Sequence, residues 1–325
     1  MWRSRIRPLL ARSRTLRAWR SRAIAAWARV NPTNRVKPYD ALPPAAAVRM
    51  AYEVLLAREP DPVGFEDYVS RITTGQISRR QLTESIRGSE EFLCRVPFSA
   101  AMLGHSVHTG RCEFIRSLPR ARRILDLGGT HLANDVGAMV AMGYPYKFDE
   151  LVIIDLPPDD RHPIYRKSDE LRQVESHLGT VTYRYHSMTD LSAFADESFD
   201  LVYSGQSIEH VTPDEGMLVM KEVHRVLRPG GHFALDTPNA RVTRLASANF
   251  IDPDHKVEYT HAELARMLAD AGFSLVEAKG LNYAGPSLEA GRFDGDAVAS
   301  SPGLYEAIED CYILAYVARK PEQVR

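Results

Sequence analysis

Ile124-Leu-Asp-Leu-Gly-Gly-Thr130 is the stretch of sequence that decides the fold. A short apolar run ends in an acid and two glycines, which is typical of a buried parallel strand that brings the backbone to a nucleotide-like ligand. After one helix-sized interval, Leu151-Val-Ile-Ile-Asp-Leu156 repeats the pattern and again ends in an acid. Two strands that end in carboxylates predict a cofactor held by its sugar hydroxyls.

Composition and charge predict a soluble globular protein with one unusual end. The chain has 325 residues and a formal net charge of −1, but residues 1–39 contain ten Arg, one Lys and no acid. The remainder therefore holds 30 basic and 42 acidic residues. Because only the basic end could supply an electrostatic footprint, nucleic acid is not the expected partner of the fold.

Cysteine usage and hydropathy place the protein in the cytoplasm, with contact to the inner face of the membrane as an option. The three cysteines are widely spaced and form neither a disulfide framework nor a metal-ligand pattern. No run of 18 apolar residues is present, so we do not expect a membrane-spanning helix.

Residues 1–44 are predicted to form a basic amphipathic arm followed by a proline-rich linker. Apolar residues recur in the arm at near-helical spacing with arginines between them: Trp2, Ile6, Leu9, Leu16, Trp19, Ile24 and Trp27. Such a helix can lie on a membrane surface or dock on a partner through residues 1–30. A solvated extension and an organelle transit peptide are the two other interpretations.

Residues 45–98 predict a small helical module, with helices at 45–57, at 65–73 and from Ser78 to about Ile86, and a further one starting at Ser89. The segment resembles a small helical domain of unknown function found in bacterial surface and glycan-related proteins. The resemblance rests on Leu56-Ala-Arg-Glu-Pro-Asp-Pro-Val-Gly-Phe65, Gly75 and Ser89-Glu-Glu-Phe92. It implies no chemistry for the module.

Residues 99–122 predict a connecting helix, and 123–320 predict an α/β domain with a Rossmann-like, seven-stranded, mostly parallel sheet. Strands are expected at 123–127, 150–155, 181–186, 199–204, 231–237, 274–282 and 311–319. Helices are expected near 132–142, 164–177, 213–227 and 261–272. The last strand follows without a helix-sized crossover, so it could pair antiparallel at or near the sheet edge.

The α/β domain resembles a class I S-adenosylmethionine-dependent methyltransferase of the ubiquinone-biosynthesis-like group. The landmarks stand in family order: Asp126-Leu-Gly-Gly-Thr130, Asp155, Phe199-Asp-Leu-Val-Tyr-Ser204 and Leu227-Arg-Pro-Gly-Gly231. The resemblance implies that S-adenosylmethionine is the cofactor. The glycine loop lacks the family's later glycines, because Thr130 and Leu132 stand there, which leaves cofactor geometry open.

Carried over residue by residue, the resemblance implies a set of cofactor contacts at the ends of the strands. Gly128 and Gly129 would let the backbone approach the methionine end of the cofactor, Asp126 would orient its amino group and Asp155 would accept its ribose hydroxyls. N-capping of the following helices is the alternative role for both acids. The full set is Asp126, Gly128, Gly129, Thr130, Asp155, Leu156, Ser187, Met188, Thr189 and Ser204.

A second element, Gln206-Ser-Ile-Glu-His210, follows the fourth predicted strand, and Asp254-His-Lys-Val-Glu-Tyr-Thr260 comes much later. Together they resemble metal-assisted O-methyltransferases, in which such residues bind a divalent cation such as Mg²⁺. The implied ligands are Glu209, His210 and His255, with Gln206 where the family has an acid. A cation would lower the pKa of an acceptor hydroxyl. The alternatives are His210 as a general base without metal, assisted by Glu209, and a purely structural role.

The sequence therefore predicts O-methylation of a hydroxyl on a small molecule or glycan. The alternatives are N- or C-methylation, a cofactor-binding scaffold without catalysis, and a dehydrogenase. The sequence indicates neither the acceptor nor the oligomeric state.

Overall fold

The computed structural model describes residues 41–56, 58–87, 89, 98–131, 135–157 and 172–322, without the side chains of 84, 87 and 98–102. The predicted arm and most of the helix expected after Ser89 lie outside these ranges. Within them, no helix is both long and apolar enough to cross a membrane.

The part of the chain that follows α6 (Phe98–Ser117) is organised by a nine-stranded sheet of order β3-β4-β2-β1-β5-β6-β9-β7-β8. Strands β4, β2, β1, β5 and β6 are parallel, and β9 runs antiparallel to both β6 and β7. The strands are β1 (Arg123–Leu127), β2 (Glu150–Asp155), β3 (Gln173–Glu175), β4 (Thr180–Tyr185), β5 (Phe199–Gly205), β6 (Leu227–Pro238), β7 (Ser274–Tyr283), β8 (Leu304–Tyr305) and β9 (Cys311–Arg319). All seven predicted strands form, which confirms the Rossmann-like, mostly parallel α/β class.

Two short strands were not predicted, and one of them corrects a predicted helix. Strand β3 occupies the end of the helix expected at 164–177, most of which lies outside the described residues. Val174 pairs with Val181 of β4 in an antiparallel edge ladder. A strand of three residues is too short to show a hydrophobic period, so periodicity could not reveal it.

Strand β9 is antiparallel, as the sequence allowed, but it lies between β6 and β7 and not at an edge. Seven of its nine residues are buried. A strand buried on both faces needs neighbours on both sides to pair its backbone groups, which explains the interior position.

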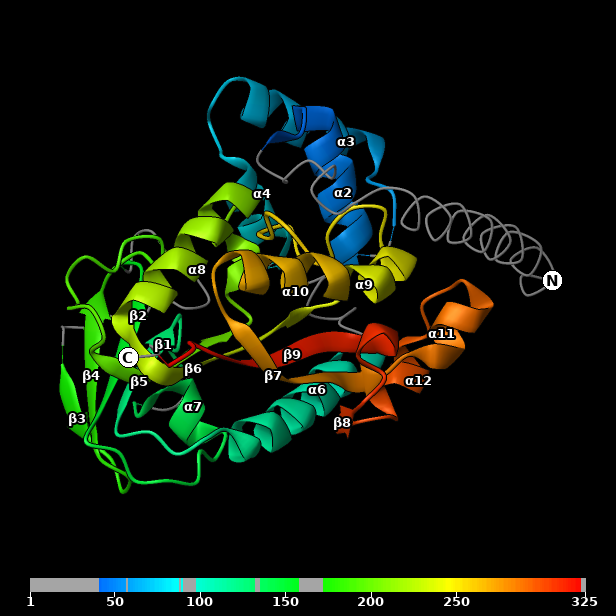
Figure 1. The fold of residues 1–325 in the computed structure, drawn as a ribbon. Coiled ribbons are helices and arrows are strands. Elements are labelled where there is room, and N and C mark those ends of the chain that lie inside the picture. The colour runs from blue at the N-terminus through cyan, green and yellow to red at the C-terminus, as the bar shows by residue number, and fades with distance from the viewer. Residues whose placement is uncertain are drawn as a thin grey trace.

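Two helical layers cover the sheet, as Figure 1 shows: α6 and α7 (Gly137–Ala141) lie on one side, and α8 (Pro213–Val226) and α10 (His261–Asp270) on the other. Neighbouring residues of β1 point to opposite layers, since Ile124 belongs to the cluster under α6 and Leu125 to the cluster under α8. The helix predicted at 132–142 is shorter than expected within the described residues. Short elements complete the domain: α9 (Ala240–Ala246), α11 (Gly285–Ala290), α12 (Gly295–Ala299), and the 3₁₀ turns η5 (Ile208–His210) and η6 (Ile308–Asp310).

The N-terminal helices α2 (Pro44–Leu56), α3 (Pro62–Thr73) and α4 (Arg79–Arg87) fall where the helical module was predicted. Helix α3 starts at Pro62 because Asp61 caps it, and the Asp61 side chain accepts a hydrogen bond from Gly64 N. The three helices pack around a shared apolar cluster, which also contains Phe250 from the α/β domain. The module therefore contacts the rest of the protein through its core.

We predict that Tyr144→Phe lowers the free energy of unfolding by about 1–3 kcal/mol. The buried Tyr144 hydroxyl accepts from Ala121 N at 2.9 Å and donates to Pro119 O at 2.8 Å, so its loss leaves two backbone groups unpaired. Urea denaturation measures the effect. The matched control is Tyr146→Phe, because Tyr146 is 39% exposed. Equal stability of the two variants would contradict the prediction.

Candidate functional site

The glycine loop after β1 has no spare room around its backbone. A methyl group added at Gly129 would lie 2.0 Å from Asp126 Oδ2, and one added at Gly128 would lie 2.9 Å from Ser207 Oγ. Gly128 also has φ +78°, which L side chains disfavour. Its N–H donates to Ile154 O of β2 at 2.8 Å, so the loop is fixed to the neighbouring strand.

Three buried polar side chains around this loop lack hydrogen-bond partners among the described residues. They are the Asp126 carboxylate, the Thr130 hydroxyl and the Ser204 hydroxyl. Buried polar groups are normally paired. Unpaired buried groups on β1, in the loop and on the adjacent strand β5 are therefore candidates for binding a polar ligand.

Burial raises the pKa of the Asp126 carboxyl to about 7, although the nearby Arg111 guanidinium opposes this shift. The capping alternative does not apply to Asp126, because α7 begins after Val136 without a side-chain cap. The side chain is thus free to serve a ligand.

The ends of β2 and β4 carry the other predicted cofactor residues. Asp155 closes β2, and its Oδ1 accepts from Leu156 N at 2.8 Å. Leu156 is 43% exposed, which is unusual for a large apolar side chain beside a strand end. His186 N donates to Asp155 O at 3.0 Å, which keeps the following residues close to Asp155.

Ser187, Met188 and Thr189 form a tight turn directly after that contact. The hydroxyls of Ser187 and Thr189 lie 2.7 Å apart, and Thr189 N donates to Ser187 Oγ at 3.2 Å. Met188 packs against the core. The structure therefore brings this turn, Asp155 and the glycine loop to the carboxyl ends of three adjacent strands.

Sequence reasoning missed a partly buried cation beneath the site. Arg111 of α6 places its Nε 2.8 Å from Asp236 Oδ1, and its Nη2 donates to the Tyr203 hydroxyl at 3.3 Å. Tyr203 in turn donates to Asp236 Oδ2. The contact joins residues that are far apart in sequence, so no local sequence pattern predicts it. Gly205 is the one related position in the sequence, because a methyl group there would lie 2.4 Å from Arg111 Nη2.

Gln206 bonds to this same acid. Its backbone N–H donates to Asp236 O at 2.8 Å, and its Nε2 donates to Asp236 Oδ1 at 2.9 Å. Its φ of +55° places the residue in the left-handed region. The structure therefore directs the Gln206 amide to Asp236.

Glu209, His210 and His255 come together at the end of β5, with one ligand atom from each within 4.8 Å of the others. Glu209 is buried; its Oε2 accepts from Thr237 Oγ1 at 2.9 Å, whereas Oε1 has no partner among the described residues. His210 is exposed, and its ring centroid lies 5.0 Å from that of His255.

A buried acid orients His255. Its Nδ1 lies 2.8 Å from Glu258 Oε1, which leaves Nε2 for another partner. Burial lowers the pKa of His255, but the hydrogen bond and charge of Glu258, together with Glu209, outweigh it and raise the pKa to about 9. Burial also raises the pKa of Glu209. His255 is therefore protonated at neutral pH unless a cation replaces the proton.

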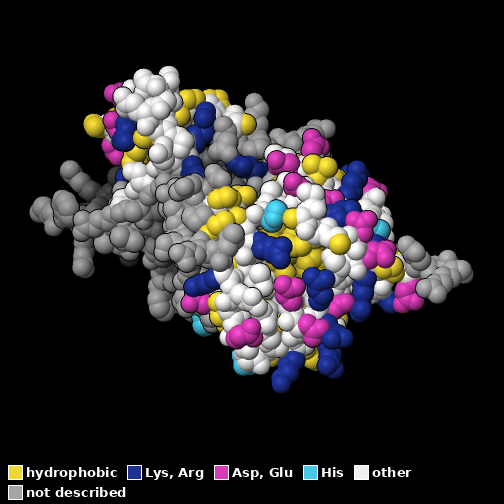
Figure 2. Space-filling view, turned by 90° about the vertical axis from the view of Figure 1, so that its left-hand side faces the viewer, with side chains coloured by type: hydrophobic (Ala, Val, Ile, Leu, Met, Phe, Trp, Pro, Cys, Tyr) yellow, Lys and Arg dark blue, Asp and Glu magenta, His cyan; other side chains and the backbone are white. Residues whose placement is uncertain are grey.

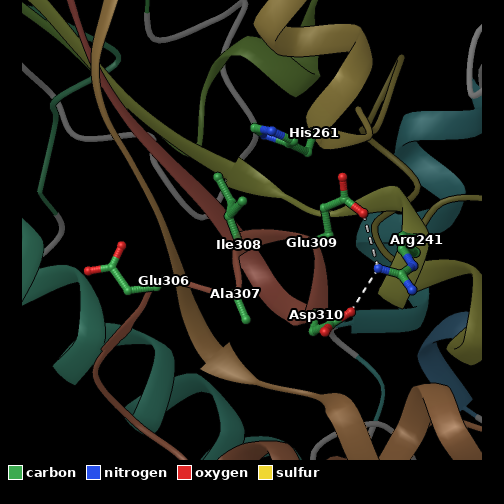
Figure 3. A pocket seen from close by; sticks show the side chains of 7 residues that line it. All are labelled: Arg241, His261, Glu306, Ala307, Ile308, Glu309 and Asp310. Carbon is green, nitrogen blue, oxygen red and sulfur yellow. Dashed lines mark hydrogen bonds and ion pairs between the residues drawn. The ribbon is translucent and has the colours of Figure 1, made fainter.

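A polar cavity of about 310 Å³ lies at η6, and Asn239, which follows β6, donates from Nδ2 to Glu309 O of this turn at 3.0 Å. Figure 3 shows the Arg241 guanidinium between two carboxylates of η6, and Arg241 Nη1 donates to Asp310 Oδ1 at 2.7 Å. The cavity is lined by Arg241, His261, Glu306, Ala307, Ile308, Glu309 and Asp310.

Two protein families match the chain. Residues 150–235 match the methyltransferase domain family, and residues 39–96 match a domain of unknown function (DUF4214). A Mycolicibacterium smegmatis protein named "Probable S-adenosylmethionine-dependent methyltransferase" is 34% identical over 108 residues, which are 33% of this chain and 41% of that protein. The chain contains a class I S-adenosylmethionine-dependent methyltransferase domain.

Two further proteins are similar to the chain. A ubiquinone biosynthesis O-methyltransferase of Pseudomonas syringae pv. tomato is 31% identical over 125 residues, 35% of this chain and 53% of that protein. The chain thus spans about half or less of the length of these two relatives. A solved S-adenosylmethionine-dependent methyltransferase of Thermotoga maritima is 18% identical, with a TM-score of 0.46 and coverage of 67% of this chain and 92% of that one.

We predict that Gly129→Ala in the methyltransferase domain weakens binding of S-adenosylmethionine at least about tenfold, because the new methyl group must displace the Asp126 carboxylate. Isothermal titration calorimetry measures the affinity. Gly104→Ala is the control, since nothing lies within 4 Å of a methyl group there. Unchanged affinity in Gly129→Ala would refute the predicted cofactor loop.

We also predict that cofactor affinity depends on pH through Asp126. Since its pKa is about 7 without ligand, the carboxyl must lose a proton below that pH before it can bind the cofactor's ammonium group. Affinity then falls by up to about tenfold per pH unit below 7 and levels off above it. Titrations between pH 5.5 and 8.5 test this, and Asp126→Asn is expected to bind weakly with a flat profile. A wild-type profile as flat as the variant's would exclude this role.

Proposed function

We propose that the protein transfers the methyl group of S-adenosylmethionine to a hydroxyl oxygen of a small molecule or glycan, with the help of a divalent cation. The observation that carries the proposal is the cluster of Glu209, His210 and His255. It lies directly beyond the glycine loop, because Ser207, which precedes η5, donates to Leu127 O at 2.8 Å. A cofactor in the loop and an acceptor at the cluster would be neighbours.

The unpaired groups around the loop support the cofactor part of the proposal. Asp126 would bind the ammonium group of the cofactor, and Thr130 and Ser204 offer hydroxyls to its polar methionine end. Arg111 supplies a positive charge beneath the same end, and Asp236 raises its pKa despite the opposing effect of burial. A permanently charged guanidinium suits a carboxylate.

The ribose and adenine would lie over the ends of β2 and β4. In the proposed arrangement Asp155 accepts the ribose hydroxyls, and the exposed Leu156 covers an apolar face of the base. The turn of Ser187, Met188 and Thr189 would border the adenine. Its hydroxyls and backbone can pair with the adenine amine.

The donor set of the cluster fits a divalent cation such as Mg²⁺ or one that prefers imidazole. It combines a buried carboxylate oxygen without a partner and two imidazoles. When bound, such a cation lowers the pKa of an acceptor hydroxyl and fixes its position. Glu209 and His255 hold their places through Thr237 and Glu258. The bond to Asp236 makes Gln206 the weakest of the four proposed ligands.

Without a cation, His210 could take the acceptor proton as a general base, because it is exposed and its Nδ1 lies 3.3 Å from Asp254 O. A bond there would leave Nε2 free to accept the proton. This is the second mechanism for the same reaction.

The polarity of the cavity at η6 supports an acceptor that bears hydroxyl groups. Its carboxylates and the Arg241 guanidinium can pair with hydroxyl groups such as those of a sugar. On the face seen in Figure 2, basic and acidic side chains of the described residues are interspersed, and these residues form no extended basic track for nucleic acid. The name of the similar ubiquinone biosynthesis O-methyltransferase supports a hydroxyl acceptor by association. N- or C-methylation and a non-catalytic cofactor-binding scaffold are the competing functions.

We predict that the purified protein transfers a labelled methyl group from S-adenosylmethionine to an acceptor in cell extract, and that chelation of divalent cations reduces the rate at least about tenfold. Mass spectrometry identifies the product. Glu209→Gln is expected to lose transfer while still binding the cofactor, whereas the exposed Glu322→Gln retains both. Full transfer in the presence of chelator would favour His210 as base. Cofactor binding without any labelled product would favour the scaffold.

A further inference from the structure

The segment Asn249–Glu258 carries His255 yet consists mainly of bends and turns. At its C-terminal end, Lys256 N and Val257 N donate to Glu209 O at 2.7 and 3.2 Å. A segment with so little regular structure needs further contacts to hold one side chain in place. Its own side chains make those contacts, in part with residues outside the segment.

Phe250 of the segment makes the first of them, and it is fully buried. It belongs to the apolar cluster of the helical module, and every other buried member of that cluster comes from the module itself: Ala47, Val48, Met50, Ala51, Tyr52, Leu56, Ile72, Leu82 and Ile86. Figure 1 shows helix α2 beside α9 and the loop that follows it. The module thus encloses a side chain of the segment.

Arg244 of α9 connects Phe250 to Glu258. Its guanidinium lies 4.9 Å from the centroid of the Phe250 ring, and its Nη1 donates both to Asn249 O and to Glu258 Oε2, the latter at 2.8 Å. The side chain is 2% exposed. A buried guanidinium in such contacts is rigid.

Glu258 joins the two ends of the segment. Its Oε1 accepts from Ile251 N at 2.7 Å and lies 2.8 Å from His255 Nδ1, while its Oε2 also accepts from Thr243 Oγ1 at 2.5 Å. The carboxylate is fully buried, so water does not compete for these bonds. The orientation of His255 therefore depends on the position of Glu258.

We propose that the helical module, packed over Phe250, holds His255 in the ligand cluster through Arg244 and Glu258. Phe250, Arg244 and Glu258 are then positioning residues, and the module is a structural support of the site. The importance of His255 for methyl transfer rests on the proposed function, but the mechanical link does not.

Hydrogen exchange of the full chain tests the link without reference to activity. In Phe250→Ala the amides of Ile251, His255 and Lys256 are expected to exchange at least about tenfold faster than in the wild type. Tyr144→Phe is the matched control, because Tyr144 lies in a different apolar cluster and its loss also destabilises the fold. Phe250→Leu retains an apolar side chain and serves if the alanine variant does not fold.

Titration with Mn²⁺ gives a second readout, in which Phe250→Ala and Glu258→Gln are each expected to bind at least about tenfold more weakly. Unchanged exchange across 249–258 in both Phe250 variants would overturn the proposal. If the wild type neither binds Mn²⁺ nor transfers methyl groups while Phe250→Ala still opens the segment, the proposed function fails and the positioning role stands.

Discussion

Asp236 is a fully buried acid, and the carboxyl edge of the sheet is assembled around it. Arg111 and Gln206 both contact its Oδ1, at 2.8 and 2.9 Å, and Tyr203 donates to its Oδ2. These partners come from helix α6, the turn after β5 and β5 itself. Removing one partner of a buried ion pair leaves an uncompensated charge, which typically costs about 3–5 kcal/mol. The helix layer, two central strands and the loop before η5 are thus bound to one carboxylate.

The charges around Asp236 also explain why the Asp126 carboxyl beside the glycine loop is unpaired and has a raised pKa. Asp126 has no hydrogen-bond donor among the described residues, and burial outweighs the charge of Arg111 in setting its pKa. Asp236 takes the direct contact with Arg111, so Asp126 is left to a ligand. The two glycines present stand where a methyl group would collide with Ser207 or with Asp126, so the loop has glycine where its close packing requires it.

Much of this arrangement could be predicted because it is local in sequence. Each central strand is an apolar run, with an acid next to the end of β1 and at the end of β2, so these strands and the place of Asp155 followed from local sequence patterns. The elements that were not predicted depend on distant partners. Strand β3 exists only as the neighbour of β4, and β9 lies inside the sheet because β7 pairs with its outer side.

Charged residues in the site were hard to interpret for the same reason. Arg111 on a helix and Arg244 before a loop have the local pattern of surface residues. Only the fold shows that Arg111 pairs with Asp236 and Arg244 with Glu258, at separations of 125 and 14 positions. Sequence patterns show which face of an element is apolar, but they do not show which charges the fold will bury.

The ion pair of Arg244 and Glu258 also suggests a reason why the helical module packs on the α/β domain. Buried ion pairs contribute little stability compared with apolar residues of similar volume, so stability alone is a weak reason to keep one. An apolar pair at these positions could cover Phe250, but it could not accept hydrogen bonds from Ile251 N and His255 Nδ1. The Glu258 carboxylate orients the His255 ring, because its contact with Nδ1 fixes which imidazole nitrogen faces Glu209. In the proposed arrangement the small module, which holds none of the proposed ligands, supports the site by keeping water and motion away from that carboxylate.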